Sequence, residues 1–276
     1  MREMKVMANL IVSPHEREEN GRIVSVTPES AGWKYVGFEL FSLKQGETLQ
    51  EVTNDKEVCL VLLSGKANVA TKEERFENIG ERMSVFEKIP PYSVYVPNQD
   101  QFHVEALTDV ELAVCLAPGK GTYKARLIAP NNVGVQDRGY GHMTRKIHNI
   151  LPEDQEADCL LVVEVYTPEG NWSSYPPHKH DQDNLPHESY LEETYYHEVN
   201  PKQGFIMQRV YNDDRTLDEA LIVKNRDVVL VPEGYHPVSA PPGYESYYLN
   251  VMAGPVRTWK FHNDSDHEWL FEGVMK

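Results

Sequence analysis

Long apolar runs are missing from this sequence of 276 residues. A membrane-spanning helix needs about 18 or more apolar residues in succession, and no stretch of the chain approaches that length. The first 21 residues also lack the continuous apolar segment of a secretory signal peptide. We therefore expect a cytoplasmic protein with no membrane partner.

Cysteine is scarce, and the three that occur are an odd number placed in apolar segments: Cys59, Cys115 and Cys159. Such positions are typical of buried, reduced thiols rather than of a disulfide framework. A catalytic thiolate requires a polar and electropositive setting, which none of the three segments provides. We expect neither disulfide bonds nor cysteine catalysis.

Positive charge is also in short supply. The chain carries 27 basic against 43 acidic residues, a formal net charge of −16, and it contains no dense block of lysine and arginine. A nucleic-acid phosphate backbone would be repelled by such a protein. The composition therefore excludes nucleic acid as a partner.

Long helical periodicity is nearly absent, and short β-type segments take its place. They are separated at short intervals by Gly, Pro, Asn and Asp, which is typical of a sandwich or barrel. The predicted fold class is therefore all-β. The expected strands lie at residues 35–43, 58–63, 92–96, 110–116, 160–166, 205–211, 227–231 and 247–252.

A repeat with a nearly constant offset divides the chain into two related halves. The early matches have offsets of 125 and 124, and the later ones have offsets of 135 or 136, so an insertion of about eleven residues is expected between His180 and Glu193. We predict a first domain at residues 1–126, a connection at 127–152 and a second domain at 153–276. The matched pairs are Glu39 with Glu164, Gly46 with Gly170, Glu57 with Glu193, Pro97 with Pro232, and Ala117 with Ala253.

A candidate metal site lies in the second half. His178 and His180 are two residues apart and would share one face of a strand, Glu193 would arrive from the paired strand, and His236 follows a Pro-x-Gly turn. Imidazole and carboxylate ligands suit a divalent metal, with Zn²⁺ as the first expectation and Mn²⁺ or Fe²⁺ as alternatives. The first half has no matching histidine pair and is predicted to hold no metal.

Other acidic residues compete with Glu193 for the carboxylate position. The repeat favours Glu193, because Glu57 matches it. If the insertion shifts the strand by one residue, Glu192 would replace Glu193, since neighbouring residues on a strand face opposite sides. Both alternatives stay open on the sequence alone.

The order of these residues resembles the two sequence motifs of the cupin superfamily, and a duplicated unit resembles a bicupin. Three features depart from the cupin pattern. The gap from His180 to Glu193 is long, Arg226 stands where the second motif normally begins with Gly, and the spacing from Gly234 to His236 is one residue short. Cupin membership implies two double-stranded β-helix barrels but does not fix a reaction.

Five further segments resemble the 5-deoxy-glucuronate isomerase family of inositol catabolism, which is related to the 4-deoxy-5-threo-hexosulose-uronate ketol-isomerases. They are NWSSYPPHKHD, LEETYYH, GFIMQRVY, GYHPV and YYLNVMAGP. The resemblance implies conversion of 5-deoxy-D-glucuronate, a small sugar acid, into 2-deoxy-5-keto-D-gluconate. It also implies that His178, His180, Glu193 and His236 bind the metal.

An aldose–ketose conversion moves a carbonyl between adjacent carbons through an enediolate. A divalent metal can stabilise that negative charge, and a base must move a proton. No glycine-rich nucleotide loop is present to hold a redox cofactor. The candidates for the base are His197, Tyr211, Glu192 and Tyr195.

The carboxylate of a sugar acid would suit a planar guanidinium. Arg209 is the first candidate, against the alternative that it forms an ion pair with an acid such as Asp214 or Glu219. Arg257 and Arg145 are further candidates. Contacts with sugar hydroxyls could come from Gln208, Tyr248 and Asn250.

Two other functions fit a bicupin: an oxygen-dependent dioxygenase, and a sugar-acid-binding protein without catalysis. The polar residues around the two motifs weigh against a dioxygenase. A non-catalytic sugar-binding protein that acts as a sensor usually carries a DNA-binding helix-turn-helix, and this sequence shows none. Exposed edge strands and a metal-free half lead us to expect self-association into a homo-oligomer.

Overall fold

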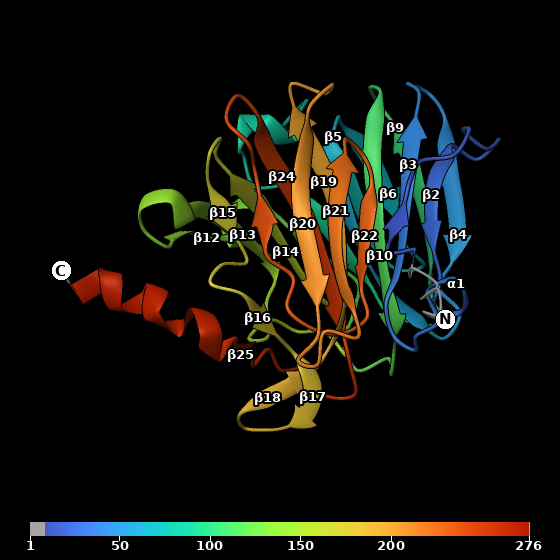
Figure 1. Cartoon of the computed structure of the whole chain (residues 1–276). Coiled ribbons are helices and arrows are strands. Elements are labelled where there is room, and N and C mark those ends of the chain that lie inside the picture. The colour runs from blue at the N-terminus through green and yellow to red at the C-terminus, as the bar shows by residue number, and fades with distance from the viewer. Residues whose placement is uncertain (1–8, 276) are drawn as a thin grey trace, which may run out of the picture.

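The computed structural model describes residues 9–275, with side chains up to residue 271. The chain folds almost entirely into β-strands, which confirms the predicted all-β class (Figure 1). The one α-helix in the described part is the short α1 (Pro28–Ala31). Four 3-10 segments accompany it: η1 (Val85–Glu87), η2 (Pro130–Asn132), η3 (Gly141–Met143) and η4 (Ser265–Met275). Among residues 9–275, no helix is both long and apolar enough to span a membrane.

Each half of the chain forms one larger and one smaller antiparallel sheet. In the first half the larger sheet has the order β11 (Arg126–Ile128), β8 (Ser93–Val96), β5 (Lys56–Ser64), β10 (Val110–Pro118), β3 (Gly37–Leu43), β2 (Arg22–Val26). The smaller sheet has the order β4 (Thr48–Val52), β9 (Gln101–Ala106), β6 (Ala67–Ala70), β7 (Arg75–Ile79).

The second half repeats this arrangement. Its larger sheet has the order β1 (Ile11–Val12), β22 (Val228–Val231), β19 (Glu192–Asn200), β24 (Glu245–Ala253), β14 (Leu161–Thr167), β13 (Arg145–Leu151), β12 (Gly134–Arg138). Its smaller sheet has the order β15 (Trp172–Ser173), β23 (Val238–Ser239), β20 (Phe205–Tyr211), β21 (Asp218–Lys224). The order β8-β5-β10-β3-β2 corresponds to β22-β19-β24-β14-β13, so the duplication seen in the sequence is also present in the strand topology.

Two short ribbons lie outside these sheets. The hairpin of β17 (Asp181–Asn184) and β18 (Glu188–Tyr190) occupies the stretch where the insertion was predicted. The ribbon of β16 (His178–Lys179) and β25 (His262–Asn263) ties the histidine pair to the C-terminal region. Both lie at the same end of the molecule in Figure 1.

The predicted domain limits differ from the observed strand pairing at two places. The predicted connection at 127–152 contains β12 and β13, which extend the larger sheet of the second half. Near the start of the chain, β1 pairs with β22 of the second half. The glycine-rich sequence around residues 134–141 concealed these strands, because glycine normally marks loops.

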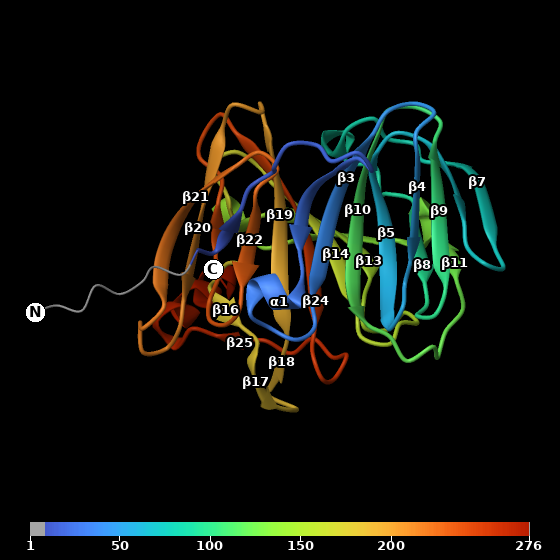
Figure 2. The same ribbon diagram turned by 90° about the vertical axis from the view of Figure 1, so that its right-hand side faces the viewer.

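The two larger sheets pack against each other, and the halves lie side by side in Figure 2. Their interface is a single apolar cluster with residues from both halves, among them Phe38, Cys59, Tyr196 and Leu249. Phe38 stacks on Tyr196 with ring centroids 5.6 Å apart. All three cysteines are buried free thiols, as predicted.

Two buried glutamates join the halves reciprocally. Glu57 of the first half accepts hydrogen bonds from the backbone N–H groups of residues 158–160, at distances of 2.5–2.8 Å. Glu192 of the second half accepts from the backbone N–H groups of residues 34–36, at 2.6–3.1 Å. Each carboxylate therefore satisfies backbone donors of the other half.

This reciprocity corrects the predicted repeat alignment. Glu57 lies opposite Ala117 in the first half, and Glu192 lies opposite Ala253 in the second. The counterpart of Glu57 is therefore Glu192, and the counterpart of Glu193 is Val58. The repeat offset in the sequence varied between 135 and 136 residues. It therefore could not decide whether Glu192 or Glu193 corresponds to Glu57.

The two barrel interiors differ in chemistry. The interior of the first barrel is filled by an apolar cluster that includes Val58, Leu60 and Phe102. In the second barrel the corresponding faces carry buried polar residues, among them Glu193, His197 and His236. Within residues 9–271, the group of buried ligand-type side chains beside an open cavity therefore lies in the second barrel.

Candidate metal centre and active-site pocket

Three side chains converge in the interior of the second barrel. Their ligand atoms, one each from His180, Glu193 and His236, all lie within 4.8 Å of one another. Glu193 is the second residue of β19. The first residue, Glu192, faces the other half of the chain. His180 follows β16, and His236 follows the turn after β22.

The contacts of these residues show what the group lacks. The Nε2 atoms of His180 and His236 each lie 3.2 Å from Oε2 of Glu193. All three atoms are buried and have no hydrogen-bond partner. Three unsatisfied polar atoms around one point are costly in a protein interior, and a cation between them would satisfy all three.

The outer atoms of the two rings fix which nitrogen faces the cluster. Nδ1 of His180 is 3.1 Å from the carbonyl oxygen of Leu191, and Nδ1 of His236 is 2.8 Å from that of Gly234. Each Nδ1 therefore donates its hydrogen to a carbonyl oxygen, which leaves a lone pair on each Nε2. Burial lowers the pKa of His236, which favours the neutral ring that a metal requires.

The carboxylate is held by one further residue. Nδ2 of Asn250, on the neighbouring strand β24, donates to Oε1 of Glu193 at 2.6 Å. Oε2 is therefore the oxygen that remains for a metal. Ligands oriented in this way by surrounding hydrogen bonds are characteristic of metal centres.

His178, the fourth predicted ligand, lies beside these three residues, but its ring nitrogens are not among the three converging ligand atoms. Its ring centroid is 5.0 Å from that of His236 and 6.4 Å from that of His180. Its ring also packs on Phe261, with centroids 4.8 Å apart. Burial lowers the pKa of His178 well below the usual value, so this ring is also neutral near pH 7.

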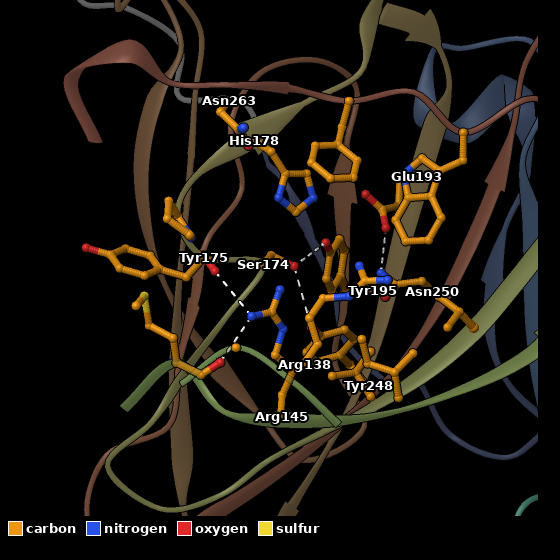
Figure 3. Close-up of a pocket in the computed structure, with 18 of the residues that line it drawn as sticks. Arg138, Arg145, Ser174, Tyr175, His178, Glu193, Tyr195, Tyr248, Asn250 and Asn263 are labelled. Atoms are coloured by element: carbon orange, nitrogen blue, oxygen red, sulfur yellow. Dashed lines mark hydrogen bonds between the residues drawn. The ribbon is translucent and has the colours of Figure 1, made fainter. Parts of the chain in front are cut away.

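A pocket of about 350 Å³ opens beside the cluster, a volume within the usual range for small-molecule sites. Glu193 and His178 contribute to its lining, as Figure 3 shows. Its floor is the inner face of the sheet β19-β24-β14-β13-β12. Aromatic side chains of the C-terminal region, Trp259, Phe261 and Phe271, cover part of it.

Three hydroxyl groups meet at this pocket. The hydroxyl of Ser174 lies 2.9 Å from that of Tyr195 and 3.4 Å from that of Tyr248. Burial raises the pKa of both tyrosines, so both are protonated phenols at neutral pH. We call Ser174, Tyr195 and Tyr248 the hydroxyl cluster. The predicted hydroxyl-binding residue Tyr248 therefore does line the pocket.

His197 and Gln208 lie beneath the pocket and do not line it. The His197 ring stacks on that of Tyr195 at 5.8 Å, and its Nε2 is 3.0 Å from Oε1 of Gln208. Burial lowers the pKa of His197 to about 4. The amide of Gln208 also contacts the carbonyl oxygen of His236, at 3.4 Å. His197 thus supports Tyr195, and Gln208 supports His197 and the backbone at His236, which corrects their predicted contact with substrate.

Two other predicted catalytic residues lie away from the pocket. The carboxylate of Glu192 is enclosed by backbone donors of the first half, on the far side of β19. The hydroxyl of Tyr211 donates to Asp264 at 2.8 Å, and two arginines lie over its ring. Glu192 points away from the pocket because neighbouring residues on a strand face opposite sides. Tyr211 is engaged because the C-terminal segment brings Asp264 to its hydroxyl.

Two predicted carboxylate-binding arginines are also engaged elsewhere. Arg209 forms a two-pronged ion pair with Asp218 of the neighbouring strand, at 2.8 and 2.9 Å. The predicted alternative of a structural ion pair was therefore the better one, with Asp218 as the acid. Arg257 donates to backbone carbonyl oxygens of residues 151–160 and ties the C-terminal region to that loop.

The chain is similar to known proteins in both sequence and structure. The sequence profile of the KduI/IolB family matches residues 10–270. The chain belongs to the KduI/IolB family. A relative from Geobacillus kaustophilus named 5-deoxy-glucuronate isomerase is 71% identical over 98% of both chains. A relative of the same name from Bacillus subtilis strain 168 is 51% identical over 96% of this chain and 100% of its own.

These relatives confirm the resemblance predicted from the sequence and identify the chain as an isomerase of this family. The crystal structure of an IolB-like protein from Salmonella typhimurium LT2 is 54% identical, with a TM-score of 0.93 over 96% of this chain and 100% of that chain.

A more distant structure supports the fold alone. An oxalate decarboxylase of Lactobacillus farciminis is 14% identical, with a TM-score of 0.67 over 93% of this chain and 89% of that chain. Together the structural neighbours confirm the predicted duplicated cupin fold.

Proposed function

We propose that the protein is a metal-dependent aldose–ketose isomerase that converts 5-deoxy-D-glucuronate into 2-deoxy-5-keto-D-gluconate in myo-inositol catabolism. The observation that carries the metal dependence is the convergence of three unsatisfied, buried ligand atoms beside the pocket. The substrate is inferred from relatives named 5-deoxy-glucuronate isomerase that are 51–71% identical over nearly the whole chain.

The residues present fit a divalent metal. His180 and His236 would contribute Nε2, and Glu193 would contribute Oε2, with His178 as the fourth ligand. We propose Zn²⁺, because two or three imidazoles and one carboxylate are a common zinc ligand set. A metal held here would supply a Lewis acid for the carbonyl and hydroxyl oxygens of the sugar.

The pocket residues have distinct tasks in this proposal. The aromatic side chains Trp259, Phe261 and Phe271 exclude water from the reacting end of the sugar. The hydroxyl cluster holds a proton at Oη of Tyr195, which can pass to and from a sugar oxygen through Ser174 and Tyr248. Stacked beneath it, His197 fixes the ring of Tyr195.

Replacing Tyr195 with Phe is expected to lower kcat by about 100-fold, because a positioned proton carrier contributes at least that factor. KM should change little, since the aromatic surface of the pocket is kept. Steady-state kinetics of the metal-loaded variant would measure both constants.

The matched control is Tyr196→Phe. Tyr196 is the next residue on β19, is equally buried, and donates its hydroxyl to Glu198 on the opposite face. This variant should retain the wild-type kcat. An equal loss of kcat in both variants would contradict a proton-carrying role for Tyr195.

The reaction itself is tested by incubating the metal-loaded protein with 5-deoxy-D-glucuronate in deuterated water and following the mixture by NMR. Formation of the 2-ketose product, with or without deuterium at the carbon that receives the proton, would support the proposal. Absence of ketose would refute it. Reaction under argon at an unchanged rate would exclude the oxygen-dependent alternative.

A further inference from the structure

Two arginines of the pocket have no acidic partner. Arg138 and Arg145 lie directly opposite each other on the paired strands β12 and β13, and both line the pocket. Neither forms an ion pair within residues 9–271. Like charges placed directly opposite on neighbouring strands destabilise a sheet unless an anion compensates for them.

The opposite face of the same two strands shows the usual arrangement. Lys146 and Asp137, each next in sequence to one of the arginines, also lie opposite each other and form an ion pair at 3.0 Å. The strands therefore carry matched charges on the outer face and two positive charges on the pocket face. Among the residues that line the pocket, Glu193 is the one acid.

The hydrogen bonds of Arg145 leave one edge of its guanidinium open. Nη1 donates to the carbonyl oxygens of Met143 and Tyr175, at 3.0 and 3.3 Å. These two contacts fix the plane of the group, and Figure 3 shows it reaching into the pocket from the side opposite His178. Nε and Nη2 have no acceptor among the described residues.

Nε and Nη2 form the edge that binds a carboxylate with two parallel hydrogen bonds. Arg209 of this chain uses the same pair of atoms to bind both oxygens of Asp218. The buried Arg82 also binds both oxygens of one carboxylate, that of Glu164, but through Nη1 and Nη2. On Arg145 the Nε and Nη2 positions face the cavity.

We propose that Arg145, assisted by Arg138, binds the carboxylate of the sugar-acid substrate at the end of the pocket opposite the metal ligands. The carboxylate takes the two hydrogen bonds that Nε and Nη2 leave unused and relieves the repulsion between the two guanidinium groups. The carbonyl end of the sugar then lies toward His180, Glu193 and His236. Partial burial lowers the pKa of Arg145 yet leaves it charged, and it strengthens an interaction with an anion.

This inference rests on the proposed function for the identity of the sugar, but its recognition element can be tested without turnover. D-Glucuronate and its methyl ester have nearly the same shape and differ in the charge of one group. Isothermal titration calorimetry would measure the binding of each to the metal-loaded wild type and to Arg145→Gln. The matched control is Lys146→Gln, which removes a positive charge from the outer face of the same strand.

The wild type and Lys146→Gln are expected to bind the acid about 10- to 100-fold more tightly than the ester, the range for hydrogen bonds to a charged group. Arg145→Gln should lose this preference, and its KM for 5-deoxy-D-glucuronate should rise by a similar factor. Arg145→Lys keeps the charge without the two-pronged edge and should fall between them. Arg138→Gln leaves the contacts of Arg145 with Met143 and Tyr175 intact and should reduce the preference for the acid by a smaller factor. This variant provides a test if Arg145→Gln fails to fold.

Wild-type protein that binds the acid no better than the ester would overturn the inference. An Arg145→Gln variant that still prefers the acid over the ester as strongly as the wild type does would also overturn it. If Arg145→Gln does not fold, the same conclusion would follow from Arg145→Lys and Arg138→Gln variants that both keep the wild-type preference. A protein that prefers the acid through Arg145 but does not isomerise 5-deoxy-D-glucuronate would refute the proposed function and leave the inference standing.

Discussion

Replacing Glu193 with Gln is expected to remove most of the bound metal and to lower kcat by at least about a thousand-fold, since the metal and its charge stabilisation are lost together. The amide keeps the size of the side chain and removes the charge that faces both Nε2 atoms. Elemental analysis of the purified variant and steady-state kinetics would measure the two effects.

Stability of the metal-free protein gives an independent readout for the same variant. Without metal, the carboxylate oxygen and two imidazole lone pairs lie together unsatisfied. An amide N–H can donate to one of those lone pairs, so metal-free Glu193→Gln should melt at the same temperature as the metal-free wild type or higher. Added metal should stabilise the wild type alone.

Glu192→Gln is the matched control for this prediction. It changes the adjacent residue of the same strand, also buried, whose carboxylate binds backbone donors of the first half. This variant should bind metal as the wild type does and should lose stability, because it removes charge-assisted hydrogen bonds between the halves. Loss of metal from Glu192→Gln with retention in Glu193→Gln would reverse the ligand assignment.

Replacing Arg82 with Met is expected to lower the free energy of unfolding by about 3–5 kcal/mol, the usual cost of leaving one member of a buried ion pair without its partner. Arg82 belongs to the first half and binds both oxygens of Glu164 in the second, at 2.8 and 2.9 Å. Both side chains are at most 2% exposed. Chemical denaturation at pH 7 would measure the loss.

The control is Arg22→Met, at an arginine–glutamate ion pair within the first half. Arg22 binds Glu39 of the neighbouring strand at 2.7 Å, but its side chain is 31% exposed. Exposed pairs contribute about 0–1 kcal/mol, so this variant should lose no more than that. A similar loss in both variants would contradict the role given to burial.

The pH dependence of the Arg82 effect follows from Glu164. Burial alone would raise the pKa of this carboxyl, but the charge of Arg82 and hydrogen bonds from His148 and Arg82 outweigh it and lower the pKa from 4.5 to about 2. A lowered folded-state pKa contributes stability that is fully present above about pH 4.5 and is lost as the pH falls toward 2. The difference between wild type and Arg82→Met should shrink over that range.

The sequence predicted the duplicated all-β architecture because strand periodicity and a repeat are local features of the chain. It also predicted the three residues whose ligand-type atoms converge, since two of them are histidines in short motifs. Glu193 was the favoured acid for an incorrect reason. The repeat match to Glu57 belongs to Glu192, and it is strand parity that turns Glu193 toward the histidines.

The prediction of the catalytic and substrate-binding residues was less accurate, because the contacts of these residues depend on tertiary structure. Arg209 and Tyr211 lie on a strand with the expected alternation, but their partners Asp218 and Asp264 come from other segments. Arg145 was a secondary candidate, and the segment that contains it was predicted as a connection between the halves. No local pattern places the 138–145 segment beside the pocket residues Glu193 and His178; the pairing of β13 with β14 does so.

The most direct test of the metal centre is a titration of chelator-treated, metal-free protein with Zn²⁺, in which isomerase activity and binding heat are followed together. The first barrel offers an apolar interior and the second offers one ligand group. Activity should therefore rise from a negligible value in proportion to added metal and reach its maximum at one ion per chain. Full activity of the metal-free protein, or activity that appears only with a second ion per chain, would contradict the account.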